Sequence, residues 1–179
     1  IIFIGNGSFV GLMQLIEKIL KPKGIETGTA GNIGAVIVLA GVAGCIVLPS
    51  ISDRIMRRKP FIVLAALMAA PTLFLMGALE NTALIFVVGG ILGFFLLSAL
   101  PVLLALAEET TGSALTGTAT SMLLLLGNAG GVVITLAMEG IKGATGGPGE
   151  SFFWAMVFLA LVFVAAFLVA LRLRESAAS

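Results

Sequence analysis

The sequence has no histidine and no tyrosine, and it has a single cysteine among its 179 residues. The absence of histidine removes the commonest metal ligand in proteins and the usual general base. With only Cys45 available, an internal disulfide is excluded. Because no serine-centred nucleophile motif takes the place of these residues, we expect no enzyme activity, no metal site and no bound cofactor.

Charged residues are also scarce. They make up 11% of the chain, and the formal net charge is +1, whereas soluble domains carry about 25% charged residues. A balance so close to neutral gives no electrostatic reason to expect nucleic acid as a partner.

What the chain has in abundance is apolar residues, which form 59% of it and give a mean hydropathy of +1.20. A water-soluble fold of this size cannot bury so much apolar surface, so we expect the lipid bilayer to surround most of the protein. In lipid, every backbone polar group must find its partner within the protein. The long continuous apolar runs are therefore expected to be helices.

Six apolar runs of about 20 residues or more are separated by polar or charged breaks, and together they predict an all-α, polytopic membrane helix bundle in one domain. The first run starts at residue 1 inside an apolar stretch, so we expect it to be a truncated helix. The second and fifth runs are rich in small residues, which favours close helix packing and a three-plus-three inverted repeat. The predicted spans are residues 1–20, 28–51, 60–79, 83–107, 114–138 and 151–171.

The distribution of basic residues predicts an orientation in the membrane. Four basic residues lie in the loop 52–59 and two more follow the last span, whereas the other side has Lys21, Lys23 and Lys142. Basic residues are enriched in cytoplasmic loops. We therefore expect an integral protein of the cell or inner membrane whose loop 52–59 and C-terminus are cytoplasmic.

The densest cluster of charge is the turn between the second and third spans, where Asp53 and Arg54 are followed by Arg57 and Arg58. An aspartate beside arginines at helix ends can form ion pairs, and such a turn can act as a conformational latch. A stop signal of the positive-inside type, with no switching role, is the alternative. We favour the latch because the turn follows a glycine-rich helix and Pro49.

This turn resembles the signature loop of the major facilitator superfamily, in which a glycine, three residues, Asp-Arg, one residue, a second glycine and two basic residues follow one another. The order of elements over nearly the whole chain is similar to helices seven to twelve of that superfamily. Within it, the branch related to the feline leukaemia virus subgroup C receptor is nearest. The chain keeps Asp53, Arg54, Arg57 and Arg58, and it has Pro49 and Met56 at the two glycine positions, departures that are typical of a C-terminal half.

The resemblance implies a secondary transporter segment that moves a small solute across the membrane by alternating access. It also implies a partner, namely an N-terminal six-helix half, in the same polypeptide or as a second chain. Animal members of the branch carry haem, choline or ethanolamine, and no substrate is transferred from them to this chain.

Four polar residues inside the spans are candidates for lining a substrate cavity, because an uncompensated polar group is costly in hydrocarbon. By the resemblance, the first span lines the central cavity, where Asn6 and Gln14 would hydrogen-bond a solute. Hydrogen bonds between helices are the alternative for both. Asn128 lies near the middle of the fifth span, where such transporters concentrate their sites, and Ser98 lies beside two phenylalanines in the fourth span.

Rows of small residues follow helical spacing in two spans, and close helix packing is the simplest interpretation of most of their members. The row in the second span contains Gly34, Gly41 and Cys45, with Gly31 and Gly44 nearby, and the row in the fifth contains Gly117, Ser121, Leu124, Asn128, Gly131 and Thr135.

Two other classes of function fit a small apolar bundle, namely a self-associating channel and a small oligomeric carrier. No ring of acidic residues or filter-like run stands out in the sequence, which counts against the channel. The acidic residues lie at the ends of the predicted spans, so a proton relay through this segment alone is not expected.

Overall fold

The computed structural model describes residues 1–112, 115–145 and 152–172, and all regular structure in that part is helical. Five of the six α-helices are long and apolar enough to cross a membrane. The exception is α1, which contains the polar residues Asn6, Gln14 and Lys18. The prediction of an all-α membrane helix bundle is therefore confirmed, and a membrane crossing by α1 stays a prediction. The helices are α1 (Ile2–Leu20), α2 (Thr27–Ile55), α3 (Lys59–Ala78), α4 (Thr82–Thr111), α5 (Thr116–Thr145) and α6 (Phe153–Leu171), with the short 3-10 helix η1 (Lys21–Lys23) between α1 and α2.

Three helices extend well beyond the predicted spans. α5 continues through Thr145, so the first part of the segment predicted as a loop after residue 138 is helical. α4 continues through Thr111, because neither glycine nor proline interrupts it between Pro101 and Gly112. α2 continues to Ile55 and ends at Met56, which has a φ of 54°. A side chain in this left-handed region is strained by about 1 kcal/mol or more, and Met56 occupies a position where the resembling loop has glycine.

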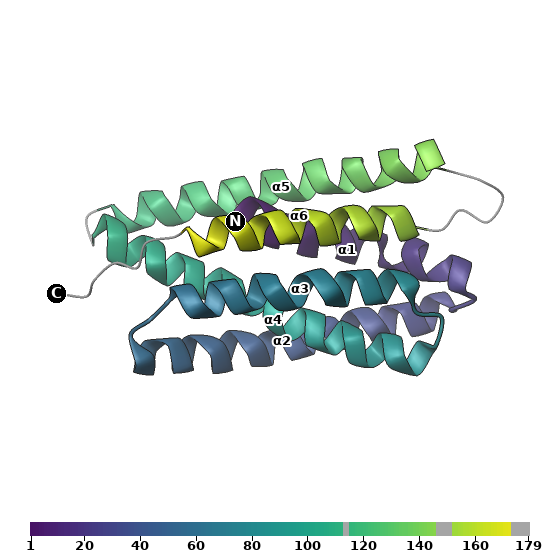
Figure 1. Cartoon of the computed structure of the whole chain (residues 1–179), viewed down its shortest axis with the longest axis horizontal. Coiled ribbons are helices and arrows are strands. Elements are labelled where there is room, and N and C mark those ends of the chain that lie inside the picture. Colours follow the sequence, from purple (N-terminus) through teal and green to yellow (C-terminus); the bar gives the residue numbers. More distant parts are fainter. Residues whose placement is uncertain (113–114, 146–151, 173–179) are drawn as a thin grey trace.

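The six helices form a bundle in which α2 and α5 lie on opposite sides, with the other four between them (Figure 1). The core between these four includes Leu12, Leu73, Leu92 and Phe163. In the apolar 18-residue stretch of α2 and of α5 that is suited to cross a membrane, 28% of the residues are buried, against 39% in α3, α4 and α6. Each of the two outer helices therefore keeps a broad uncovered face.

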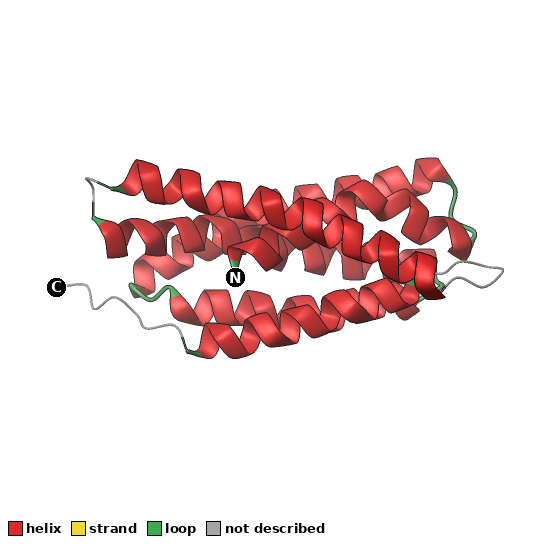
Figure 2. Cartoon of the chain, turned by 90° about the horizontal axis from the view of Figure 1, so that it is seen from above, coloured by secondary structure: helices red, strands yellow, loops and turns green. Residues whose placement is uncertain are grey.

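Turns and loops gather at the two ends of the bundle (Figure 2). The turn between α2 and α3 lies at the same end as the close of α6 (Figure 1), as the predicted orientation requires. We call this end the turn end. The predicted cytoplasmic C-terminus, with Arg174, lies outside the described residues, and so do residues 146–151 between α5 and α6.

Helix α1 packs along α5 in a constant register of 121 residues. Asn6 lies against Gly127 and Val10 against Gly131. Farther along the same two helices, the side chains of Lys18 and Glu139 meet. Because the register holds over three turns of both helices, α1 and α5 behave as one rigid pair.

Helices α2 and α4 form a second pair of the same kind, in a register of 56 residues, with Ile37 against Gly93 and Gly41 against Leu97. The third extensive pair is α3 with α6. The contacts of these two pairs are equivalent. Adding 86 to a residue number in α2 gives the equivalent residue in α5, and adding 91 to a residue number in α1 gives the equivalent residue in α4.

The closest backbone approaches show this internal repeat most clearly. A Cβ atom built on Gly44 of α2 would lie 2.1 Å from the carbonyl oxygen of Phe94, and one built on Gly130 of α5 would lie 2.1 Å from that of Phe3. The two glycines are 86 residues apart and the two phenylalanines 91. Helices approach this closely only where side chains are absent. The packing therefore repeats between α1–α3 and α4–α6, as the small residues of the second and fifth spans indicated.

Candidate functional site

The uncovered flank shared by α1 and α5 carries polar side chains from both helices. Gln14 of α1 is exposed there, and its side-chain oxygen accepts a long hydrogen bond of 3.5 Å from Thr135 Oγ1 of α5. Small residues beneath this flank let the two helices approach closely, so polar side chains from both helices share one surface. Its further members on α5 are Ser121 and Asn128, both exposed.

The two asparagines belong to the two helices of this pair, Asn6 to α1 and Asn128 to α5. A Cβ atom on Gly127 would lie 2.8 Å from Asn6 Nδ2, so the half-buried Asn6 side chain covers the residue that precedes Asn128. Within the part of the chain that the structure describes, neither asparagine side chain has a hydrogen-bond partner. Both amides are free to bind a solute, water or another protein segment.

Ser98 lies in a different environment from the other three predicted cavity residues. Its side chain is 1% exposed, and its hydroxyl donates a 2.8 Å hydrogen bond to the carbonyl oxygen of Phe95 in the same helix. This hydroxyl is satisfied within α4, so the structure does not bring Ser98 to the surface shared by the asparagines.

The internal repeat shows how one-sided this polarity is. Asn6 corresponds to Leu97 in α4, and Asn128 corresponds to Val42 in α2. Gln14 and Thr135 likewise correspond to Ala105 and Pro49, so the equivalent flank of the second pair is apolar. Packing alone is satisfied by apolar residues at these positions, as the second pair demonstrates. The amides of the first pair therefore need a reason other than packing.

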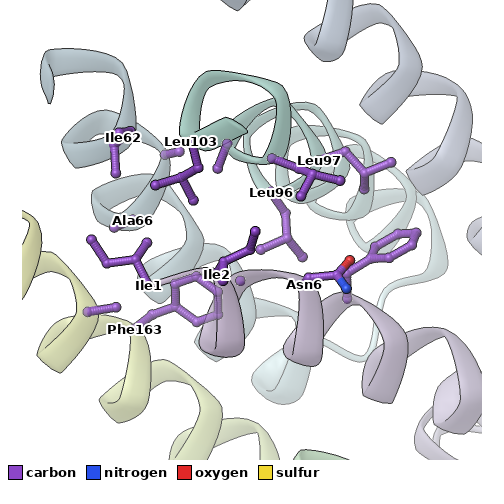
Figure 3. A pocket seen from close by; sticks show the side chains of 15 residues that line it. Ile1, Ile2, Asn6, Ile62, Ala66, Leu96, Leu97, Leu103 and Phe163 are labelled. Carbon is purple, nitrogen blue, oxygen red and sulfur yellow. The ribbon is translucent and has the colours of Figure 1, made fainter. Parts of the chain in front are cut away.

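A cavity of about 110 Å³ opens between α1, α3, α4 and α6, beside the start of α1 (Figure 3). Its walls are mainly aliphatic, with Ile62, Leu96 and Phe163 among the lining residues, and Asn6 stands at its edge with its amide atoms visible. The cavity thus connects an apolar wall with one of the two free amides.

The turn between α2 and α3 forms a compact ionic cluster at the turn end. Arg58 pairs with Asp53, and it also donates to Glu109 of α4 from Nε at 3.0 Å and from Nη2 at 2.8 Å. The fully buried Ser52 donates to the carbonyl oxygen of Arg57, which fixes the path of the turn. Burial disfavours the charged guanidinium, but the hydrogen bonds with Glu109 and Asp53 outweigh it and raise the pKa of Arg58 above its ordinary value. The cluster ties three helix ends together.

The four residues of the predicted latch loop thus divide into two groups. The structure brings Asp53 and Arg58 together, whereas Arg54 and Arg57 are exposed and form no ion pair among the described residues. Glu109, the third member of the cluster, is not among the residues predicted for the latch loop. The signal was available, because an even number of spans separates the turn from the end of α4 and so places both at one end of the bundle.

At the opposite end, two lysines join helices that are far apart in the sequence. Lys18 of α1 pairs with Glu139 of α5 at 2.5 Å, with 58% and 35% of the two side chains exposed. Lys23 donates to the carbonyl oxygens of Met76, Gly77 and Leu79, at 2.8, 2.7 and 2.6 Å. Burial lowers the pKa of Lys23, and the nearby carboxylate of Glu80 opposes part of this change.

Lys23 is expected to stabilise the bundle by capping α3. Its three hydrogen bonds satisfy carbonyl groups that have no partner inside the helix. Replacing Lys23 with methionine should lower the stability by about 1–3 kcal/mol, measured as the thermal unfolding midpoint in mild detergent. Lys21→Met is the matched control, because Lys21 is exposed and forms no such bonds. Equal melting of the two variants would show that the cap contributes nothing.

Comparison with known proteins gives two informative similarities. An uncharacterized protein of Archaeoglobus fulgidus is 33% identical over 175 residues, which cover 98% of this chain and 77% of the archaeal protein. The chain belongs to the same family as this archaeal protein. No family model matches the chain.

The second similarity carries a functional name. An uncharacterized MFS-type transporter of Caenorhabditis elegans is 30% identical over 146 residues. The match covers 77% of this chain but only 25% of the nematode protein, so this chain is similar to a segment of a much longer protein.

Proposed function

We propose that the chain is one six-helix half of a secondary transporter of the major facilitator type. It moves a small solute by alternating access, together with a second six-helix half. The observation that carries the proposal is the pair of free amides, Asn6 and Asn128, on an uncovered flank between the ends of the bundle. The similarity to part of the nematode MFS-type transporter supports the same assignment.

The internal repeat supports a rocking mechanism. Transporters of this kind are built from inverted repeats, and one bundle rocks against another around a site near the midplane. The constant registers of the pairs α1–α5 and α2–α4 favour motion of the half as one body. We place the chain with C-terminal halves, nearest to the branch related to the feline leukaemia virus subgroup C receptor, on the residues of the charged turn. We also assign the turn end to the cytoplasm.

The solute face combines neutral hydrogen-bonding groups with apolar walls. Asn6, Gln14 and Asn128 offer amide donors and acceptors, and the adjoining cavity is mainly aliphatic. Sites of this composition orient a ligand through a few polar contacts while apolar surfaces enclose the rest. We infer that any coupling to protons or sodium uses groups of the other half.

The test is uptake into proteoliposomes by the complete natural protein, with organic cations, amphiphiles and small acids screened under a pH gradient. Asn128→Ala and Asn6→Ala should each weaken the apparent affinity by up to about tenfold, the equivalent of one hydrogen bond of roughly 1–1.5 kcal/mol. Leu161→Ala is the control, because Leu161 is exposed on α6 and belongs to neither of the pairs α1–α5 and α2–α4. Wild-type affinity in both asparagine variants would contradict the cavity assignment.

A further inference from the structure

The uncovered faces of α2 and α5 match each other position by position. Leu39 and Leu125, which the repeat makes equivalent, are 68% and 69% exposed, and Ile46 and Val132 are 64% and 62% exposed. Each helix therefore presents the same broad strip of its surface outside the bundle. These strips are here called the α2 face and the α5 face, and the two helices that carry them run along opposite edges of the bundle (Figure 1).

Lipid alone does not suit the whole of the α5 face. Ser121 and Asn128 are exposed on it, and Asn128 lies near the middle of a 30-residue apolar helix. A side-chain amide in hydrocarbon without a partner is costly, and polar groups at this depth face protein or a water-filled cavity. A protein segment must therefore stand opposite this part of α5 in the assembled molecule.

The length of the archaeal relative limits what that segment is. A match of 175 residues that makes up 77% of the relative gives it a length of about 230 residues. After a segment equivalent to this chain, about 50 residues remain, too few for six further spans of about 20 residues each. By the same measure the nematode protein has about 580 residues, which is room for two such bundles. Members of the archaeal family must find a second half in another molecule.

We propose that the missing half is a second copy of the same polypeptide, so that the transporter is a symmetric dimer. This inference rests on the proposed function. A twofold axis along the membrane normal places α2 of one copy against α5 of the other, and the same contact occurs twice, as closed dimers require. Val42 and Asn128 both lie near the middle of their helices. Val42 of one copy and Asn128 of the other therefore meet at the same depth at one edge of the shared cavity, and the reverse pair meets at the other edge.

The dimer accounts for the unequal polarity of the two helix pairs. In a single copy, only the α1–α5 pair carries amides on its open flank. A second copy related by the twofold axis brings another α1–α5 pair across the cavity, and each apolar α2–α4 flank then closes against a polar one. Both faces of the cavity obtain hydrogen-bonding groups from one gene product.

Disulfide cross-linking of the complete natural protein tests the pairing of α2 with α5. In a Cys45→Ser background, one tagged copy carries Val42→Cys and a differently tagged copy carries Asn128→Cys, and both are expressed together and oxidised in the membrane. The expected product is a cross-linked species that carries both tags. Val42→Cys expressed alone should give none, because the two copies of α2 lie on opposite sides of the dimer. Leu161→Cys, on an exposed position of α6, is the control for random collision with Val42→Cys.

The mass of the detergent-solubilised protein and its solute uptake separate the two proposals. Particles of two chains that cross-link as expected support the dimer, whether or not uptake occurs, and loss of uptake alone would count only against the transporter. Uptake by particles of one chain would overturn the dimer and leave the transporter standing. A coding sequence that joins this chain to a different six-helix half would also overturn the dimer, and so would cross-linking to Leu161→Cys as efficient as to Asn128→Cys.

Discussion

Replacing Gly44 or Gly130 with alanine is expected to prevent the bundle from packing. The added Cβ atom would lie 2.1 Å from a backbone carbonyl oxygen in either case, that of Phe94 or that of Phe3. A backbone atom cannot turn away as a side chain does, so the two helices would have to separate along their whole contact. We expect a loss of about 3 kcal/mol or more for each substitution, measured as the unfolding midpoint in mild detergent or, where no folded protein is recovered, as the yield of monodisperse protein.

The internal repeat supplies a matched control for both substitutions. Gly31 and Gly117 are related by the same shift of 86 residues, lie in the same two helices as Gly44 and Gly130, and would have no atom within 4 Å of an added Cβ. Gly31→Ala and Gly117→Ala should leave stability unchanged or raise it slightly, because alanine favours the helix by roughly 1 kcal/mol over glycine. Similar losses in all four variants would show that helix propensity or hydration, and not the contacts of the pairs α1–α5 and α2–α4, decides the result.

These glycines show which features of the fold can be predicted from the sequence and which cannot. Run length and composition were enough to predict an all-α membrane bundle, because lipid leaves the backbone few alternatives. The second span was also interpreted as a close-packing helix from its row of small residues. Gly31 and Gly44 look alike in that row, however, and only the position of α4 decides which of them meets a backbone. Depth and rotation of a helix depend on its neighbours, which the local pattern does not contain.

The repeat itself could have been found in the sequence. A shift of 86 residues aligns Gly31, Gly41 and Gly44 with three glycines of the fifth span. The same alignment sets Asn128 against Val42 and so marks Asn128 as the residue without a packing reason. The sequence does not show whether Ser98 lines the cavity. A serine in a helix often donates a hydrogen bond to the backbone of its own helix, and residue spacing does not show whether it does.

Arg58 is expected to contribute to stability as strongly as Lys23, at the opposite end of the bundle. The Arg58 side chain is 14% exposed and pairs with Asp53 and Glu109, so Arg58→Gln leaves both carboxylates without the ion-pair partner that they share. The partial burial places the expected loss between that of a surface ion pair and that of a buried one, at about 1–3 kcal/mol, seen as a lower unfolding midpoint. Arg54→Gln is the control, since Arg54 belongs to the same turn but is exposed and has no ion pair among the described residues.

The cause of that loss can be isolated by removing the carboxylates as well. If Arg58 acts by balancing Asp53 and Glu109, the triple variant Asp53→Asn, Glu109→Gln, Arg58→Gln should recover much of the stability that Arg58→Gln loses, because the repulsion disappears with the charges. If the guanidinium acts instead through its packing at the ends of α2, α3 and α4, the triple variant should melt no higher than Arg58→Gln.

A conformational latch at this turn has a kinetic consequence that a permanent ion pair does not have. It must open and close in each transport cycle, so Arg58→Gln should change the rate of uptake more than the apparent affinity for the solute.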